Sequence, residues 1–160
     1  MASSAPKTTR FYAFFKLGAS DAAGRGVLSS IKEDLHLSVT SVKTADVYSV
    51  QGIVLSQKEK EKLAQFLFSD SVVQDQSIDQ EPFSSRDGNW LLEVSFKPGV
   101  TDNVGHTSLI GMRDVLGREL PVGAAVRTSH QYCVKGKLAQ KDAEKTCSGL
   151  LANAVIQNYS

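Results

Sequence analysis

The sequence contains one pattern twice, and this internal repeat is the feature that most constrains its fold. Segments 15–35 and 96–116 align at an offset of 81 residues and share seven identical positions. The correspondence continues as far as Gln74 and Gln157, with the offset growing to 84 and then settling at 83. A repeat that runs the length of both halves predicts two copies of one structural unit.

Each copy begins with a pattern typical of a strand followed by a helix. Apolar residues alternate over residues 11–15 and 92–96, which places them on one face of a strand. Apolar residues then follow a four-residue spacing, from Ala23 to Leu35 in the first copy and from Val104 to Leu116 in the second. This spacing predicts an amphipathic helix, and we expect its apolar stripe to cover the preceding strand.

The remainder of each copy predicts a second strand, a second helix and a short last strand. Extended patterns cover residues 42–50 and 126–134, and a helix is expected to begin after Ser56 and after Ala139. Gly52 and Gly136 follow the extended segments at matching positions and indicate a bend or a bulge. The expected fold class is α+β, with the order strand, helix, strand or hairpin, helix, strand in each copy.

A short polar segment joins the copies and sets the expected domain organisation. Residues 80–89 ("QEPFSSRDGN") contain Pro82 and Gly88 and are typical of a linker. We therefore expect an N-terminal tail over residues 1–10, a first repeat over 11–79 and a second over 90–160. A unit of about 75 residues buries a limited core by itself, so the two repeats are expected to pack together as a pseudo-dimer.

Composition restricts the compartment and the partners. A net charge of +1 gives no broad positive field for nucleic acid or an anionic membrane. Cys133 and Cys147 are the only cysteines and lack the spacing of a metal site or a disulfide framework, which favours the cytoplasm. No apolar run approaches the roughly 18 residues of a membrane span. The segment "MASSAPKTTR" fits a disordered tail better than a transit peptide.

The segments "FKLGASDAAGRG" (15–26) and "FKPGVTDNVGHT" (96–107) raise the question of a phosphate-binding loop. Such a loop has four residues between its glycines and then a lysine and a hydroxyl residue. Five residues separate Gly18 from Gly24, an arginine follows, and the second copy has the same glycine spacing followed by a histidine. The pattern favours a turn and a helix cap over anion binding at the helix start assisted by Lys16 or Lys97.

Six residues of these segments are therefore expected to define turns and helix caps. Glycine at the first position suits a turn with positive φ, and the aspartate suits the helix amides that follow. The predicted structural residues are Gly18, Asp21, Gly24, Gly99, Asp102 and Gly105. Replacing Asp102 with alanine is expected to cost about 1 kcal/mol through the lost cap.

Two stretches of the second copy resemble the PurS family, the small component of phosphoribosylformylglycinamidine synthase. They are "FKPGVTDNVG" (96–105) and "GLLANAVIQNY" (149–159), and the first copy carries weaker versions in "FKLGASDAAG" and "FLFSDSVVQD". The resemblance covers nearly all of residues 11–159, once per repeat, with Leu17 standing where the second copy has Pro98. Tandem units of this kind are also similar to the N-terminal region of larger synthase chains.

The resemblance implies a fold, a function and a set of partners. It implies two tandem PurS-like repeats in a pseudo-dimer, which a linker would make intramolecular. The implied role is a noncatalytic assembly component in de novo purine biosynthesis that bridges the synthetase and the glutaminase for ammonia transfer. The family reaction is an ATP-dependent amidation by a ligase, and this component implies no catalytic residue, cofactor or metal of its own.

The residues themselves do not indicate an independent small enzyme. His36, His106 and His130 are scattered and have no triad partner placed by the sequence, and Cys147 lies on an apolar helical stripe. An RNA-binding α+β module is the rival interpretation, but its aromatic motif is missing and the basic residues are balanced by acids. A PurS-like body recruited as an interaction subunit of another complex is a further alternative.

Overall fold

The computed structural model describes residues 8–86 and 89–160, and it confirms the α+β class. The first half forms β1 (Thr9–Phe15), α1 (Ala22–Glu33), β2 (Val39–Gln51), α2 (Gln57–Leu63), the π-helical segment η1 (Ala64–Phe68) and β3 (Gln74–Ile78). The second half forms β4 (Asn89–Phe96), α3 (Asn103–Leu116), β5 (Ala125–Gly136), α4 (Gln140–Thr146), the π-helical segment η2 (Cys147–Leu151) and β6 (Gln157–Tyr159). Both halves therefore have the order of elements that the hydrophobic pattern predicts.

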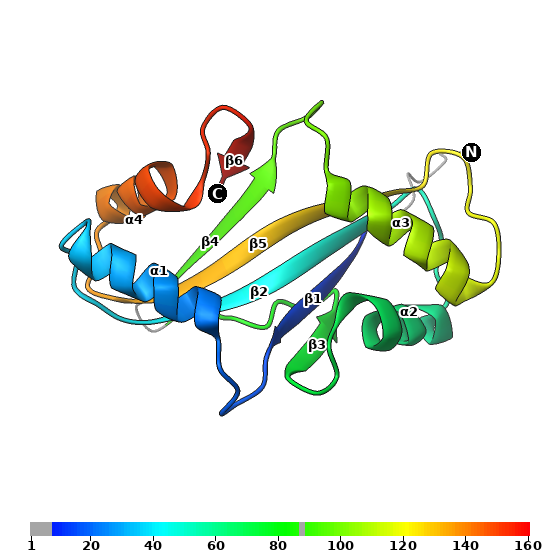
Figure 1. Ribbon diagram of the computed structural model, residues 1–160, viewed down its shortest axis with the longest axis horizontal. Coiled ribbons are helices and arrows are strands. Elements are labelled where there is room, and N and C mark those ends of the chain that lie inside the picture. Colours follow the sequence, from blue (N-terminus) through cyan, green and yellow to red (C-terminus); the bar gives the residue numbers. More distant parts are fainter. Residues whose placement is uncertain (1–7, 87–88) are drawn as a thin grey trace. The chain divides into compact units, whose positions relative to one another are not determined.

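The strands form a six-stranded antiparallel sheet in the order β3-β1-β2-β5-β4-β6 (Figure 1). Phe11 pairs with Ile78 between β1 and β3, and Glu93 pairs with Gln131 between β4 and β5. Among the described residues, no helix is long and apolar enough to cross a membrane.

The elements divide into two compact units, and each unit takes elements from both sequence repeats. Unit 1 combines the described residues up to Lys16 with residues 47–82 and 102–128. Unit 2 combines residues 17–46, 83–101 and 129–160. The boundaries between the units therefore differ from the boundaries between the repeats.

The core of unit 1 contains an apolar stripe from α3 that covers β1. Met112 and Phe11 are fully buried in the same cluster. Phe68 of η1 stacks on Tyr48 with ring centroids 4.6 Å apart and lies 4.8 Å from Phe11. Figure 1 shows α2 beside α3, and Lys62 Nζ donates a hydrogen bond to the Val115 carbonyl over 2.5 Å. Each large apolar side chain buried here stabilises the fold by roughly 1.5–3 kcal/mol.

The core of unit 2 corrects the expectation that each helix covers the first strand of its own repeat. Ile31 of α1 packs with Leu92 of β4 and Val134 of β5, whereas Phe11 of β1 belongs to unit 1. The chain leaves unit 1 directly after β1, so the stripe of α1 meets strands of the other repeat. Helix periodicity predicts which side chains are buried, but it does not predict which strand they meet.

Candidate functional site

The predicted turn residues occupy equivalent conformations in the two copies. Gly18 and Gly99 both have a φ of 86°, which side-chain-bearing residues rarely adopt. Gly24 and Gly105 lie in the first turns of α1 and α3, and both are buried. A Cβ at Gly105 would lie 2.3 Å from the Val126 carbonyl oxygen, so this position admits no side chain.

Each predicted cap aspartate binds a strand residue in addition to the start of its helix. Asp21 is the N-cap of α1, and its Oδ1 accepts the Gly24 backbone N–H over 2.6 Å. Its Oδ2 also accepts the Thr44 backbone N–H over 2.8 Å, and the Thr44 hydroxyl donates to the same carboxylate. Asp21 therefore joins α1 to β2.

Asp102 repeats this arrangement in unit 1. Its Oδ1 accepts the Gly105 N–H over 2.7 Å, and its Oδ2 accepts the Thr128 N–H over 2.6 Å. The Thr128 hydroxyl adds contacts of 2.9 and 3.0 Å to the two carboxylate oxygens. Sequence reasoning identified the aspartates but missed Thr44 and Thr128 as their partners, although these threonines align with each other at an offset of 84.

The two lysines considered for anion binding each bind a backbone carbonyl. Lys16 Nζ donates to the Ser71 carbonyl over 2.7 Å, and Lys97 Nζ donates to the Ala154 carbonyl over 2.5 Å. Each lysine also donates its backbone N–H to the same turn, at Val73 and Ile156. These contacts fix the turns that precede β3 and β6.

The groups considered for chemistry are dispersed. His130 Nδ1 lies 2.8 Å from Asp46 Oδ1, and both side chains are largely exposed. Burial raises the pKa of the Cys147 thiol to about 11 and also raises the pKa of Cys133, so both are protonated at neutral pH. The described part of the chain holds no group of three His, Cys, Asp or Glu residues that could bind a metal ion.

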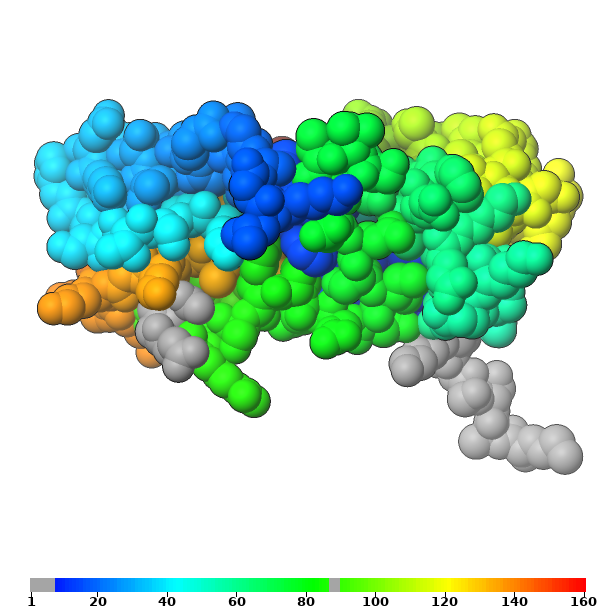
Figure 2. Space-filling model, turned by 90° about the horizontal axis from the view of Figure 1, so that it is seen from below, coloured from blue at the N-terminus to red at the C-terminus, as the bar shows by residue number. Residues whose placement is uncertain are grey.

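An open groove lies in unit 2, and we call it the lysine groove. Three lysines line it: Lys32 near the end of α1, and Lys135 and Lys137 at and after the end of β5. The remaining lining residues are Leu37, Ser38, Val39, Thr40 and Gly136. Figure 2 shows the start of β2 (cyan) directly beside the end of β5 (orange), where these residues meet.

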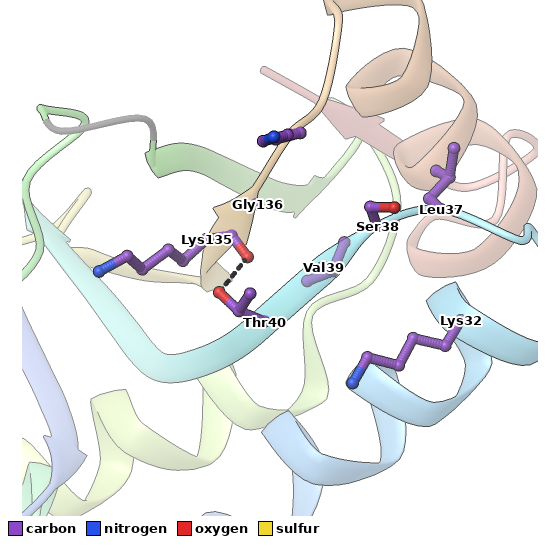
Figure 3. Close-up of a pocket in the computed structure, with 8 residues that line it drawn as sticks. Lys32, Leu37, Ser38, Val39, Thr40, Lys135 and Gly136 are labelled. Atoms are coloured by element: carbon purple, nitrogen blue, oxygen red, sulfur yellow. Dashed lines mark hydrogen bonds between the residues drawn. The ribbon is translucent and has the colours of Figure 1, made fainter.

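The backbones of β2 and β5 approach closely in the lysine groove because Gly136 has no side chain. A Cβ at Gly136 would lie 2.4 Å from the Ser38 carbonyl oxygen and 2.8 Å from the Val39 Cα. The Lys137 N–H donates to the Ser38 carbonyl over 3.1 Å, and the Thr40 hydroxyl donates to the Lys135 carbonyl over 3.0 Å (Figure 3). The floor of the groove is therefore fixed by one backbone hydrogen bond and one from the Thr40 hydroxyl, while the Lys32 and Lys135 side chains extend away (Figure 3).

The three lysines of the groove carry positive charge without a direct ion pair to a described residue. Lys32, Lys135 and Lys137 are exposed, and none of them forms an ion pair with any residue that the structure describes. The described residues that line the groove include no acid and no aromatic side chain. Figure 3 shows the ammonium groups of Lys32 and Lys135 well apart, so the charge is spread along the groove.

The equivalent positions in the first copy show that the fold does not require these lysines. Gly52 corresponds to Gly136, and a Cβ there would lie 2.5 Å from the Gly123 carbonyl oxygen. The same close approach therefore occurs in unit 1, but Gln51 and Ile53 stand where unit 2 has Lys135 and Lys137. Position 32 corresponds to Arg113, which is paired with its neighbour Asp114 at 3.6 Å.

Sequence reasoning missed the lysine groove because Lys32 lies far along the chain from Lys135 and Lys137. The available signal was the contrast between the copies, since lysines flank Gly136 and neutral residues flank Gly52. No protein-family model matches the chain, and no curated protein matches it either.

Proposed function

We propose that the chain is a noncatalytic assembly component of phosphoribosylformylglycinamidine synthase, acting in the cytoplasm in de novo purine biosynthesis. In this role it bridges the synthetase and glutaminase components, so that ammonia released from glutamine reaches the synthetase. The proposal starts from the PurS resemblance in residues 96–105 and 149–159. It assigns the chain binding surfaces and no reacting groups.

The observation that carries the proposal is the repeated link between a helix cap and a strand. Asp21 with Thr44 and Asp102 with Thr128 make the same set of hydrogen bonds in the two copies. The π-helical segments η1 and η2 also begin 83 residues apart, at Ala64 and Cys147. These matched details support a duplicated unit, and the resemblance of residues 96–105 and 149–159 suggests that this unit is of PurS type. In such a duplication one chain supplies two related surfaces for partners.

The proposal is tested by isolating the tagged chain from extracts of its own cells at moderate salt. Mass spectrometry is expected to identify the synthetase and the glutaminase at comparable amounts in the retained material. The tag alone and an unrelated tagged α+β protein serve as controls. Recovery of a different protein complex or of RNA in place of both enzymes would reject the proposed assembly.

A further inference from the structure

We propose that the lysine groove binds a carboxylate-rich segment of a partner protein. The inference rests on the proposed assembly role only for the identity of that partner, which would be the synthetase or the glutaminase. The charge of the groove comes from Lys32, Lys135 and Lys137, which have no acidic partner among the described residues. A segment with several aspartate or glutamate residues supplies the complementary charge.

The distribution of the lysines favours an extended ligand over a single phosphate. A compact phosphate site needs donors that converge on one point, commonly backbone N–H groups at a helix start or in a nest. In the lysine groove, the Leu37, Val39 and Lys137 N–H groups already donate to backbone carbonyls. The separated ammonium groups (Figure 3) instead match carboxylates spaced along a peptide.

The lining of the groove favours a protein segment over RNA. Single-stranded nucleic acid binds through aromatic side chains on which bases stack, together with a basic path for its backbone. The described residues of the lysine groove supply the basic side chains but no aromatic platform. Leu37, which is half-buried at the groove, adds apolar surface suited to the aliphatic parts of a peptide.

The difference between the copies indicates a function for the lysines. Both copies retain the glycine that permits the close approach of the strands, at Gly52 and Gly136. If lysines were required for the close approach of the strands, both copies would have them beside this glycine. The first copy instead has Gln51 and Ile53 at the positions of Lys135 and Lys137. The three lysines form no ion pair with a described residue, so the free protein gains no ion-pair stabilisation from them.

The direct test measures binding of a fluorescent peptide of twelve alternating glutamate and glycine residues by anisotropy. The wild type is compared with the triple variant Lys32→Gln, Lys135→Gln, Lys137→Gln. The variant is expected to bind about tenfold more weakly, since each exposed charge pair contributes roughly 0.5 kcal/mol. Wild-type affinity is expected to fall as salt rises, and the variant is expected to show a smaller dependence on salt.

A matched control removes the same charge from unit 1. The triple variant Lys58→Gln, Arg113→Gln, Arg127→Gln includes the counterpart of Lys32 and leaves the lysine groove intact. It is expected to bind the peptide within about twofold of the wild type. An equal loss of peptide affinity in both triple variants would overturn the proposal, because the net charge of the protein alone would then explain the binding. Equal unfolding midpoints in urea confirm that all three proteins are folded.

Two further measurements separate the outcomes. Tighter binding of a twelve-nucleotide poly-uridine RNA than of the peptide, lost in the groove variant, would overturn the choice of a protein ligand. So would displacement of the peptide by millimolar inorganic phosphate at constant ionic strength. Isolation of the groove variant from cell extracts is expected to recover at least tenfold less of one enzyme component than the wild type recovers.

Failure of this inference is distinguishable from failure of the proposed function. If the groove variant retains both enzymes as well as the wild type does, the lysine groove is not their docking site and the assembly role stands. If the wild type retains neither enzyme but its peptide binding depends on the three lysines, the assembly role fails and the acidic-segment site stands.

Discussion

The Thr128 backbone N–H donates to Oδ2 of Asp102 over 2.6 Å, and the Thr128 hydroxyl donates to the same carboxylate. Asp102 is only 8% exposed, and it also caps α3 through the Gly105 N–H. One carboxylate therefore satisfies donors from a helix and from a strand of unit 1. In this arrangement the aspartate is a structural link whose lone pairs are committed to fixed donors.

Replacing Asp102 with alanine is expected to destabilise the protein by about 3 kcal/mol. The lost cap on the Gly105 N–H accounts for about 1 kcal/mol, and the Thr128 N–H and hydroxyl left without an acceptor add about 2 kcal/mol. The sequence predicts only the cap, and therefore a cost of about 1 kcal/mol. Urea unfolding of the wild type and the variant measures the difference. A cost below 1 kcal/mol would mean that the link to Thr128 contributes nothing.

The equivalent variant in unit 2 provides an internal comparison. Asp21 makes the same bonds as Asp102 but is partly exposed, so water replaces its lost partners more readily. Asp21→Ala is expected to cost about 2 kcal/mol, which is less than the cost of Asp102→Ala. A larger loss for Asp21→Ala would show that exposure does not control these energies.

Glu59 is expected to make stability fall in acid. A hydrogen bond from Arg118 over 2.7 Å, together with the Ser56 backbone N–H, lowers the pKa of Glu59 from 4.5 to about 2. Because the pKa is lower in the folded state, the contribution is complete above pH 4.5 and is lost as the pH falls towards 2. The ion pair faces solvent, so screening limits its value to about 1 kcal/mol.

The measurement compares the free energy of unfolding of the wild type and Glu59→Gln at pH 7 and pH 3. The variant is expected to be less stable by about 1 kcal/mol at pH 7, and the difference is expected to shrink at pH 3. Arg118→Gln serves as the matched partner variant. A difference that stays constant between the two pH values would contradict the lowered pKa.

A methyl group at Gly136 is expected to strain the junction of β2 and β5 in unit 2. The new Cβ would lie 2.4 Å from the Ser38 carbonyl oxygen, so Gly136→Ala is expected to cost about 2 kcal/mol. Gly26 in α1 is the control, since a Cβ there meets nothing within 4 Å. Gly26→Ala is expected to stabilise the protein by about 0.5–1 kcal/mol. Thermal unfolding of both variants checks these opposite signs.

The order of elements follows from the sequence, because hydrophobic periodicity is a local property. The turn glycines and the cap aspartates can also be predicted from the sequence, because a cap residue binds backbone amides only two or three residues away. The packing of Ile31 with Leu92 does not follow, because the stripe of α1 fits any apolar strand surface. The lysine groove was not predicted either, since only the tertiary structure places Lys32 in the same groove as Lys135 and Lys137.

The two cysteines are expected to react slowly with thiol reagents in the folded protein. Desolvation raises the pKa of Cys147 to about 11 and also raises that of Cys133, and both residues are buried. The thiolate that attacks the reagent is therefore scarce at pH 7.5. Labelling with dithiobis-nitrobenzoate is expected to release two equivalents of colour only after denaturation. Rapid labelling of the native protein would contradict the buried positions.

The assembly role is tested most directly by the glutamine-dependent amidation of formylglycinamide ribonucleotide. Purified synthetase and glutaminase from the same cells are assayed with and without this chain, and ammonium chloride replaces glutamine in the control. The proposed role predicts that the glutamine-dependent rate requires the chain, while the ammonia-dependent rate does not change. A glutamine-dependent rate that is equally high without the chain would contradict it.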